Sequence, residues 1–100
     1  MDNNKCIVMI AGQAKPGMDE YIKRNLIKMM EYSRKDEGCI IYNIHESVNN
    51  PGEFMVYMVW KDNVSFEKHN QKPEMQEFRN KLAAEWFDIQ SPKTFWHLLK

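Results

Sequence analysis

Histidine is the residue type in this 100-residue sequence that is best suited to proton transfer. His69 follows Trp60 by nine positions and Phe66 by three, so a helix through this segment would place the imidazole on the same side as the Phe66 ring. A neutral imidazole, with an unperturbed pKa near ~6.5, can accept a proton close to neutrality. His69 is therefore the candidate catalytic base. A role at the helix surface or at the edge of the core is the alternative that the pattern leaves open.

The other two histidines have weaker chemical contexts. His45 alternates with Asn43 and Cys39 along an expected strand, which predicts polar groups on one otherwise apolar face. That arrangement fits the lining of a pocket or the rim of an interface equally well. His97 lies between Trp96 and Leu98, a setting that favours an interface role.

Metal and cofactor chemistry has little support in the sequence. The three histidines lie on separate expected elements, without an HxH, an HxxxH or a histidine–carboxylate pair at ligand spacing. No serine occupies a GxSxG-type turn, and the four glycines are scattered singly, unlike a phosphate-binding loop. We expect no metal ion and no other cofactor.

Methionine and aromatic residues predict a binding pocket for a flat organic molecule. The chain has eight methionines and twelve aromatic residues, and many of them gather around residues 54–86. Methionine adapts its shape to its neighbours, so pocket walls rich in methionine suit a flat aromatic ligand. Ordinary core packing is the alternative for most of them. The expected substrate-binding residues are Asn43, His45, Tyr57, Met58, Trp60, Phe66 and Phe78.

The apolar periodicity predicts six elements in the order βαββαβ. Asp62 or Asn63 can cap the helix that carries Phe66 and His69, and Pro73 suits the first turn of a second helical segment. This order is that of a ferredoxin-like α+β domain, with a four-stranded antiparallel sheet and two helices on one face. The expected strands are 5–14, 39–47, 54–61 and 94–99, and the first helix is 18–36.

Both faces of the expected sheet are apolar. In the first strand Cys6, Val8 and Ile10 alternate with an equally apolar set, whereas a strand buried on one face should alternate with polar residues. The two helices can cover only one face. A second copy of the same sheet is the simplest cover for the other, which predicts a face-to-face homodimer, a dimeric α+β barrel.

Composition sets further limits. Fourteen basic residues balance fourteen acidic ones, so neither nucleic acid nor an anionic membrane surface is an expected partner. No apolar run approaches the ~20 residues of a membrane span, and the N-terminus does not resemble a signal peptide. We expect a single domain over residues 1–100 and a cytoplasmic location.

Cys6 and Cys39 should not form a disulfide. The first and second strands flank the third, so their axes lie about 9–10 Å apart, whereas a disulfide needs Cα atoms within roughly 7 Å.

Four segments in order resemble the antibiotic biosynthesis monooxygenase (ABM) family: 15–17 (Lys-Pro-Gly), 37–39 (Glu-Gly-Cys), 60–62 (Trp-Lys-Asp) and 66–69 (Phe-Glu-Lys-His). The resemblance implies a dimeric ferredoxin-like domain that oxidises phenols, quinols or polycyclic aromatics with O2, often without metal or flavin. Such chemistry needs a base, hydrogen-bond donors for the substrate anion and a dry cavity.

One departure from the family pattern concerns Met58. Relatives commonly carry Glu two residues before the Trp or Tyr, so this chain lacks that carboxylate. The haem-degrading branch of the family uses an Asn, a Trp and a His, which would fall at Ile10, His69 and Arg79 of this chain, and none of the three matches.

Three hypotheses remain: a cofactor-independent monooxygenase with His69 as base, a non-oxidative enzyme such as an isomerase, and a non-catalytic dimeric ligand-binding protein.

Overall fold

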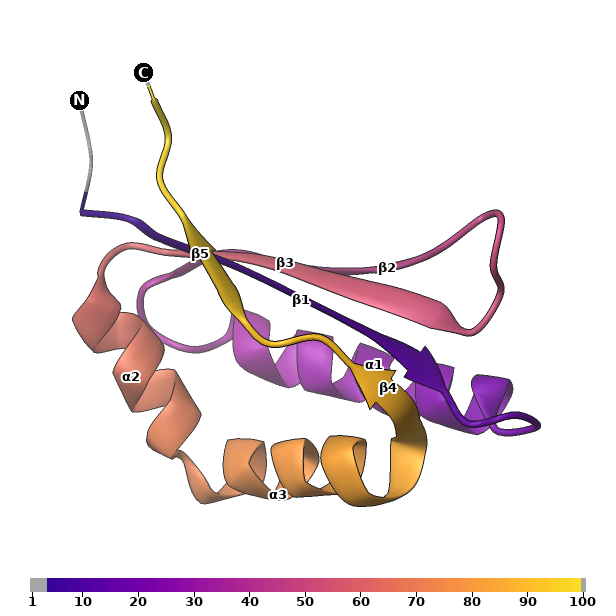
Figure 1. Ribbon diagram of the computed structural model, residues 1–100. Coiled ribbons are helices and arrows are strands. Elements are labelled where there is room, and N and C mark those ends of the chain that lie inside the picture. Colours follow the sequence, from indigo (N-terminus) through magenta and orange to yellow (C-terminus); the bar gives the residue numbers. More distant parts are fainter. Residues whose placement is uncertain (1–3, 100) are drawn as a thin grey trace.

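The computed structural model describes residues 4–99 as an antiparallel sheet with its helices on one face (Figure 1). The N-terminal residues 1–3, on which the signal-peptide expectation depends, and Lys100 lie outside the described residues. The elements are β1 (Cys6–Ala14), α1 (Asp19–Arg34), β2 (Cys39–Glu46), β3 (Glu53–Trp60), α2 (Asn63–Gln71), α3 (Pro73–Lys81), the π-helical turn η1 (Leu82–Trp86), β4 (Phe87–Gln90) and β5 (Thr94–Trp96).

The sheet has the order β2-β3-β1-β4, and β5 also pairs with β1. The expected ferredoxin-like arrangement is confirmed, with β3 between β1 and β2. Cys6 and Cys39 both pair with Trp60, one on each side of β3, and both are free thiols. Their separation follows from the strand order, because a whole strand lies between them.

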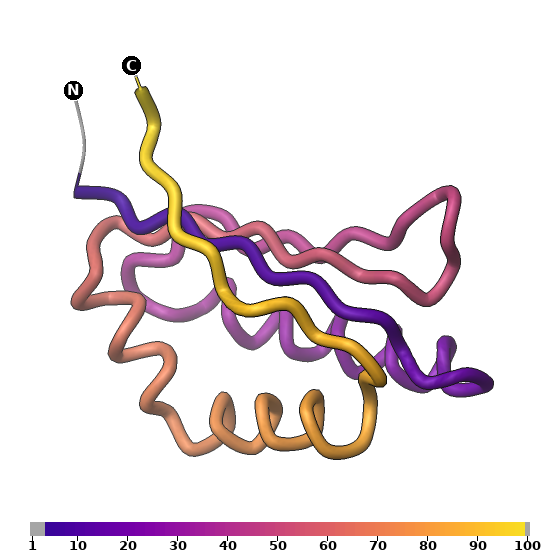
Figure 2. Tube along the Cα trace, viewed as in Figure 1, coloured from indigo at the N-terminus to yellow at the C-terminus, as the bar shows by residue number. Residues whose placement is uncertain are grey.

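The fourth strand differs from the prediction of a single strand over 94–99. β4 begins directly after Trp86, and β5 ends at Trp96, with residues 91–93 between the two strands (Figure 2). Pro92 has no N–H for a ladder hydrogen bond, so pairing is interrupted there. The hydroxyl of Ser91 instead donates to the carbonyl of Ala11 at 3.0 Å and accepts from its N–H at 2.8 Å.

A bulge in β2 corrects the predicted face of Cys39. Cys39 pairs with Trp60, but Ile41 pairs with the next residue of β3, Val59, so Ile40 is an extra residue. An extra residue inverts the alternation of side chains on its two sides. Cys39 therefore packs on the helix-covered side, whereas Asn43 and His45 lie on the opposite side.

The helices begin where the sequence predicts. The Asp62 side chain caps α2 by accepting a hydrogen bond from the Ser65 N–H at 2.8 Å, and Pro73 opens α3. The buried stripe of α1 has helical spacing and packs onto the sheet. It consists of Ile22, Leu26, Met29 and Ser33.

The two faces of the sheet differ in burial. The inner face, which the helices cover, carries alternate residues of β3 that are at most 8% exposed: Phe54, Val56, Met58 and Trp60. The outer face carries the residues between them and their neighbours on the other strands, among them Ile7, Met9, Asn43, His45, Met55, Tyr57, Val59 and Trp96. Trp96 is 56% exposed, and Met9 and Tyr57 are partly exposed. Apolar side chains of the outer face are thus partly exposed in the single chain, apart from Val59, which is 5% exposed.

Within residues 4–99, no helix has the length and apolar character needed to cross a membrane.

Candidate functional site

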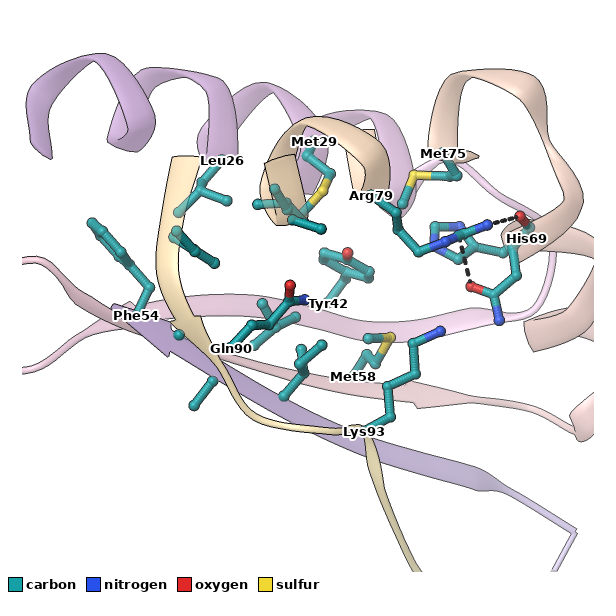
Figure 3. Close-up of a pocket in the computed structure, with 18 residues that line it drawn as sticks. Leu26, Met29, Tyr42, Phe54, Met58, His69, Met75, Arg79, Gln90 and Lys93 are labelled. Carbon is teal, nitrogen blue, oxygen red and sulfur yellow. Dashed lines mark hydrogen bonds between the residues drawn. The ribbon is translucent and has the colours of Figure 1, made fainter. Parts of the chain in front are cut away.

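A cavity of about 270 Å³ lies between the inner face of the sheet and the helices (Figure 3). Most of its wall is apolar, with contributions from β1, β3, α1, α3 and β4. The polar side chains His69, Arg79 and Lys93 extend toward one end, and Leu26 and Phe54 line the other. The wall is formed by Ile10, Ala11, Gly12, Leu26, Met29, Tyr42, Phe54, Val56, Met58, His69, Asn70, Met75, Arg79, Leu82, Ala83, Phe87, Gln90 and Lys93.

His69 is a buried titratable group of this wall that can accept a proton near neutral pH. It is 2% exposed, and its ring centroid lies 4.5 Å from that of Trp60. Its Nδ1 lies 2.7 Å from Oδ2 of Asp36, a residue just beyond the C-terminal end of α1. Asp36 is itself only 6% exposed in its side chain and also forms an ion pair with Lys72. The imidazole is therefore fixed by a carboxylate behind it and by the indole of Trp60 beside it.

The contact with Asp36 determines which nitrogen of His69 can do chemistry. A carboxylate accepts hydrogen bonds, so the neutral imidazole carries its proton on Nδ1 and keeps the lone pair on Nε2. Burial lowers the pKa of His69 below its usual value, while Asp36 acts in the opposite direction. The net effect is a neutral imidazole at neutral pH; since Nδ1 is bonded to Asp36 and His69 lines the cavity, Nε2 is the nitrogen left to accept a proton. This is the state that a general base requires.

Two cations share the polar end of the cavity with His69. Arg79 donates to the Asn70 side-chain oxygen at 3.3 Å and to the Asn70 carbonyl at 2.6 Å. Lys93 lies with its Nζ 5.6 Å from the centroid of the Phe66 ring. Burial lowers the pKa of Lys93, and the positive charge of Arg79 adds to the effect. Hydrogen-bond donors for an anion are thus present near the base.

Tyr42 forms part of the wall but is not suited to act as a base. Its side chain is 3% exposed, and burial raises its pKa to about 12. It therefore stays protonated at neutral pH. Its ring lies 5.7 Å from that of His69 and packs edge-on against Trp60. Tyr42 and Trp60 together hold the imidazole in place.

The predicted site residues divide into three groups. His69 and Met58 line the cavity. Trp60, Phe66 and Phe78 lie on the helix side without contributing to its wall: Trp60 packs against His69 and Phe66, and Phe78 packs against Tyr32. Asn43, His45 and Tyr57 lie on the outer face, away from the cavity. Asn43 accepts a hydrogen bond from Arg34 at 2.8 Å.

Sequence reasoning missed three polar residues. Asp36 lies 33 positions before His69, and no local pattern links the two. Arg79 follows Met75 by one helical turn, so the predicted apolar stripe of α3 could have placed it beside the cavity. No sequence pattern indicated Lys93, because its position depends on the break between β4 and β5.

Among the described residues, no group of three or more His, Cys, Asp or Glu side chains could hold a metal ion.

The family assignment follows from a match to the sequence profile described as antibiotic biosynthesis monooxygenase, which covers residues 6–81. The chain belongs to this family. The matched region runs from the start of β1 to the end of α3, so it contains Asp36, His69 and Arg79 but not Lys93.

Individual relatives of this ABM domain are distant in sequence. An uncharacterized protein of Synechocystis is 30% identical over 78 residues, which are 74% of this chain and 52% of that protein. The chain thus spans about half the length of the curated relative that it matches.

Solved structures confirm the ABM-type fold. A Pseudomonas aeruginosa protein has a TM-score of 0.87 at 20% identity, covering 100% of this chain and 99% of its own. A Shewanella oneidensis protein has a TM-score of 0.88 at 19% identity, with 96% and 92% covered. A candidate antibiotic biosynthesis monooxygenase from Nitrosomonas europaea has a TM-score of 0.86 at 16% identity, with 99% and 94% covered. At these identities the likeness concerns the fold.

Proposed function

We propose that this ABM protein is a cofactor-independent monooxygenase that oxidises a phenolic, quinol or polycyclic aromatic molecule with O2. The observation that carries the proposal is the buried Asp36–His69 pair at the wall of an apolar cavity. Family membership supports a monooxygenase-type role, and the cavity supports an aromatic substrate. His69 is proposed as the catalytic base and Asp36 as its positioning residue.

The reaction begins with proton transfer from a substrate hydroxyl to Nε2 of His69. The imidazolium that forms is stabilised by the carboxylate of Asp36, with which Nδ1 is already hydrogen-bonded. The substrate anion lies near Arg79 and Lys93, whose positive charges favour the anion over the neutral phenol. The apolar wall limits the access of water to the cavity, which strengthens the interactions between the anion and these two charges.

The oxygen chemistry then uses electrons from the substrate itself. The anion transfers one electron to O2, and the resulting radical pair combines to form a carbon–oxygen bond. The peroxide takes a proton from His69; loss of the ring proton and cleavage of the oxygen–oxygen bond release water and leave a carbonyl. A hydroquinone and O2 thus give a hydroxyquinone and water, and no external reductant is required.

Oxygen consumption tests this function directly. Purified protein is incubated with a panel of hydroquinones and polycyclic phenols in an oxygen-electrode cell, and the product is analysed by mass spectrometry after reaction under labelled O2. The proposal expects one labelled oxygen atom in the product and one in water. Turnover of none of the panel, or turnover without oxygen uptake, would contradict it.

A non-oxidative role is the second candidate, and Met58 is the observation that favours it. Met58 lies in the cavity wall at the position where relatives commonly carry Glu. Without that carboxylate, the Asp36–His69 pair could move a proton between substrate carbons, as in an isomerase, or the cavity could bind a ligand without reaction. Exchange of substrate protons with D2O, in the absence of oxygen uptake, would identify the isomerase.

A homodimer is part of the same proposal. The outer face presents Met9, Tyr57 and Trp96, all partly or largely exposed in the single chain. Two such faces in contact would bury apolar area on both sheets, and a stable interface of this kind exceeds roughly 2,000 Å². Light scattering at micromolar concentration should give twice the 12.0 kDa mass of the chain. A monomeric mass would contradict the dimer.

A further inference from the structure

The polar end of the cavity carries two cations and no acidic side chain. Arg79 reaches it from α3, and Lys93 reaches it from the 91–93 segment between β4 and β5 (Figure 3). None of the 18 residues that line the cavity is Asp or Glu. The charge of the wall is therefore positive while His69 is neutral.

The contacts of these cations compensate their charges only in part: Glu67, beyond ion-pair distance, acts to raise the pKa of Lys93 against the larger effect of burial. Arg79 donates to the two neutral oxygens of Asn70, and Lys93 lies over the Phe66 ring. Across residues 4–99, neither side chain is within ion-pair distance of a carboxylate. Asp36, the nearby buried acid, already binds His69 and Lys72.

An arrangement of this kind has a direct energetic consequence. Positive charges beside an apolar cavity are poorly solvated. The pKa of Lys93 is lowered first by burial and second by the positive charge of Arg79. A substrate hydroxyl that loses its proton to His69 supplies one negative charge. A second, permanent negative charge on the ligand would balance the second cation. The planar guanidinium of Arg79 suits carboxylate and phosphate oxygens in particular.

We propose that the ligand of this cavity is an aromatic molecule that carries a carboxylate or phosphate group, bound by Arg79 and Lys93 at the polar end. The proposal rests on the proposed function in placing the aromatic body, with its reactive hydroxyl, next to His69. The volume of about 270 Å³ is just below the ~300–1,000 Å³ typical of ligand pockets, so a body of one or two rings fits.

Binding of ligands that cannot be oxidised by the proposed reaction tests the inference. Naphthalene carboxylate, naphthyl phosphate, naphthalene methanol and naphthalene methylamine share one ring system and lack a free phenol. Isothermal titration calorimetry at low salt should show that an anionic member binds at least about tenfold more tightly than the neutral alcohol, and that the amine binds most weakly. A tighter carboxylate or a tighter phosphate identifies which anion the site takes. Equal affinity for the alcohol and both anions, or no binding of either anion at millimolar concentration, would overturn the proposal.

Variants that remove one positive charge test which residues cause the preference for anionic ligands. Lys93→Gln and Arg79→Gln should each reduce the preference for the anion by about tenfold, while affinity for naphthalene methanol stays the same. Arg79→Lys should retain most of the preference, because it retains the charge. Lys68→Gln is the matched control, since Lys68 is exposed on α2 and does not line the cavity. A preference that survives the double variant of Lys93 and Arg79 would overturn the proposal.

These measurements are separate from the proposed oxygenation. Anion preference without oxygen uptake on any phenol would support the anionic subsite and contradict the monooxygenase. Oxygen uptake with neutral hydroquinones, combined with equal binding of charged and neutral naphthalenes, would support the monooxygenase and contradict the subsite.

Discussion

The inner and outer faces of the sheet are built from the same strands but have different environments. Along β3, Met58 and Trp60 face the helices and are at most 4% exposed, whereas Met55 and Tyr57 on the outer face remain partly exposed. The inner face lines a cavity and carries a buried histidine, and the outer face presents partly exposed apolar side chains. Because we propose chemistry on the inner side and assembly on the outer side, substitutions on the two sides should affect different measurements.

The largest expected effect is on the inner face, at His69. His69→Asn keeps a donor near the position of Nδ1 for Asp36 but removes Nε2, the proposed base. Loss of a general base costs ~10²–10⁴-fold in rate. We expect a loss of this size in steady-state oxygen uptake, with the dimer mass unchanged. His69→Ala is the less informative variant, because it also removes the hydrogen-bond partner of Oδ2 in the buried Asp36 and leaves only the pair with Lys72, at ~1–3 kcal/mol.

The control for this prediction is the outer-face histidine. His45→Ala should leave turnover unchanged, because His45 is exposed and pairs with Met55 away from the cavity. If His69→Asn keeps full activity while His45→Ala loses it, the base is on the outer face and the assignment of the two faces is reversed.

On the outer face, Met9→Asp should break the proposed dimer. Each protomer would bring an unpaired carboxylate into an apolar interface, and a buried unpaired charge costs several kcal/mol. We expect the dissociation constant of the dimer to rise by ~10²-fold or more in sedimentation equilibrium. Val48→Asp is the matched control, because Val48 is 93% exposed in the β2–β3 loop. An unchanged dimer in the Met9 variant would mean that this face is not the interface.

A smaller effect is expected at Asp36, behind the inner-face histidine. Asp36→Asn keeps an acceptor for Nδ1 but removes the negative charge that raises the pKa of His69. The pKa of His69 should therefore fall further, and the acidic limb of the pH–rate profile should shift to lower pH. The rate at its plateau should drop about tenfold, less than the ~10²–10⁴-fold of losing the base. NMR titration of the imidazole measures the shift, and an unchanged pKa would contradict the role given to Asp36.

The smallest expected effect is on stability. Burial holds the pKa of His69 below its value in the unfolded chain, so the unfolded state binds more protons as the pH falls through ~6.5. The free energy of unfolding should decrease across this range and level off below the folded pKa. Urea denaturation between about pH 8 and about pH 5 should show a shallower decrease for His69→Asn than for the native protein. Equal slopes would mean that His69 titrates normally.

Local sequence signals predicted most of the fold. The cap at Asp62, the proline that opens α3 and the apolar stripe of α1 are decided by interactions within a few residues, so they can be recognised in the sequence. The break between β4 and β5 could not be placed in this way, because its position depends on how Ser91 bonds to Ala11, 80 residues away.

The candidate site was only partly predictable for the same reason. His69 and Met58 were found because their positions follow from the register of α2 and β3. Asn43, His45 and Tyr57 were expected at the pocket, but a strand that is apolar on both faces does not indicate which face is covered by helices.

The sequence by itself determined the order of the elements, the family and the helical position of His69, since each depends on local pattern. Only the tertiary structure decided that Asp36 orients His69, that Arg79 and Lys93 meet at one end of the cavity, and that Cys39 turns inward at the bulge of β2. These contacts join residues that are far apart in the chain. They depend on how the sheet and helices pack, which no short segment encodes.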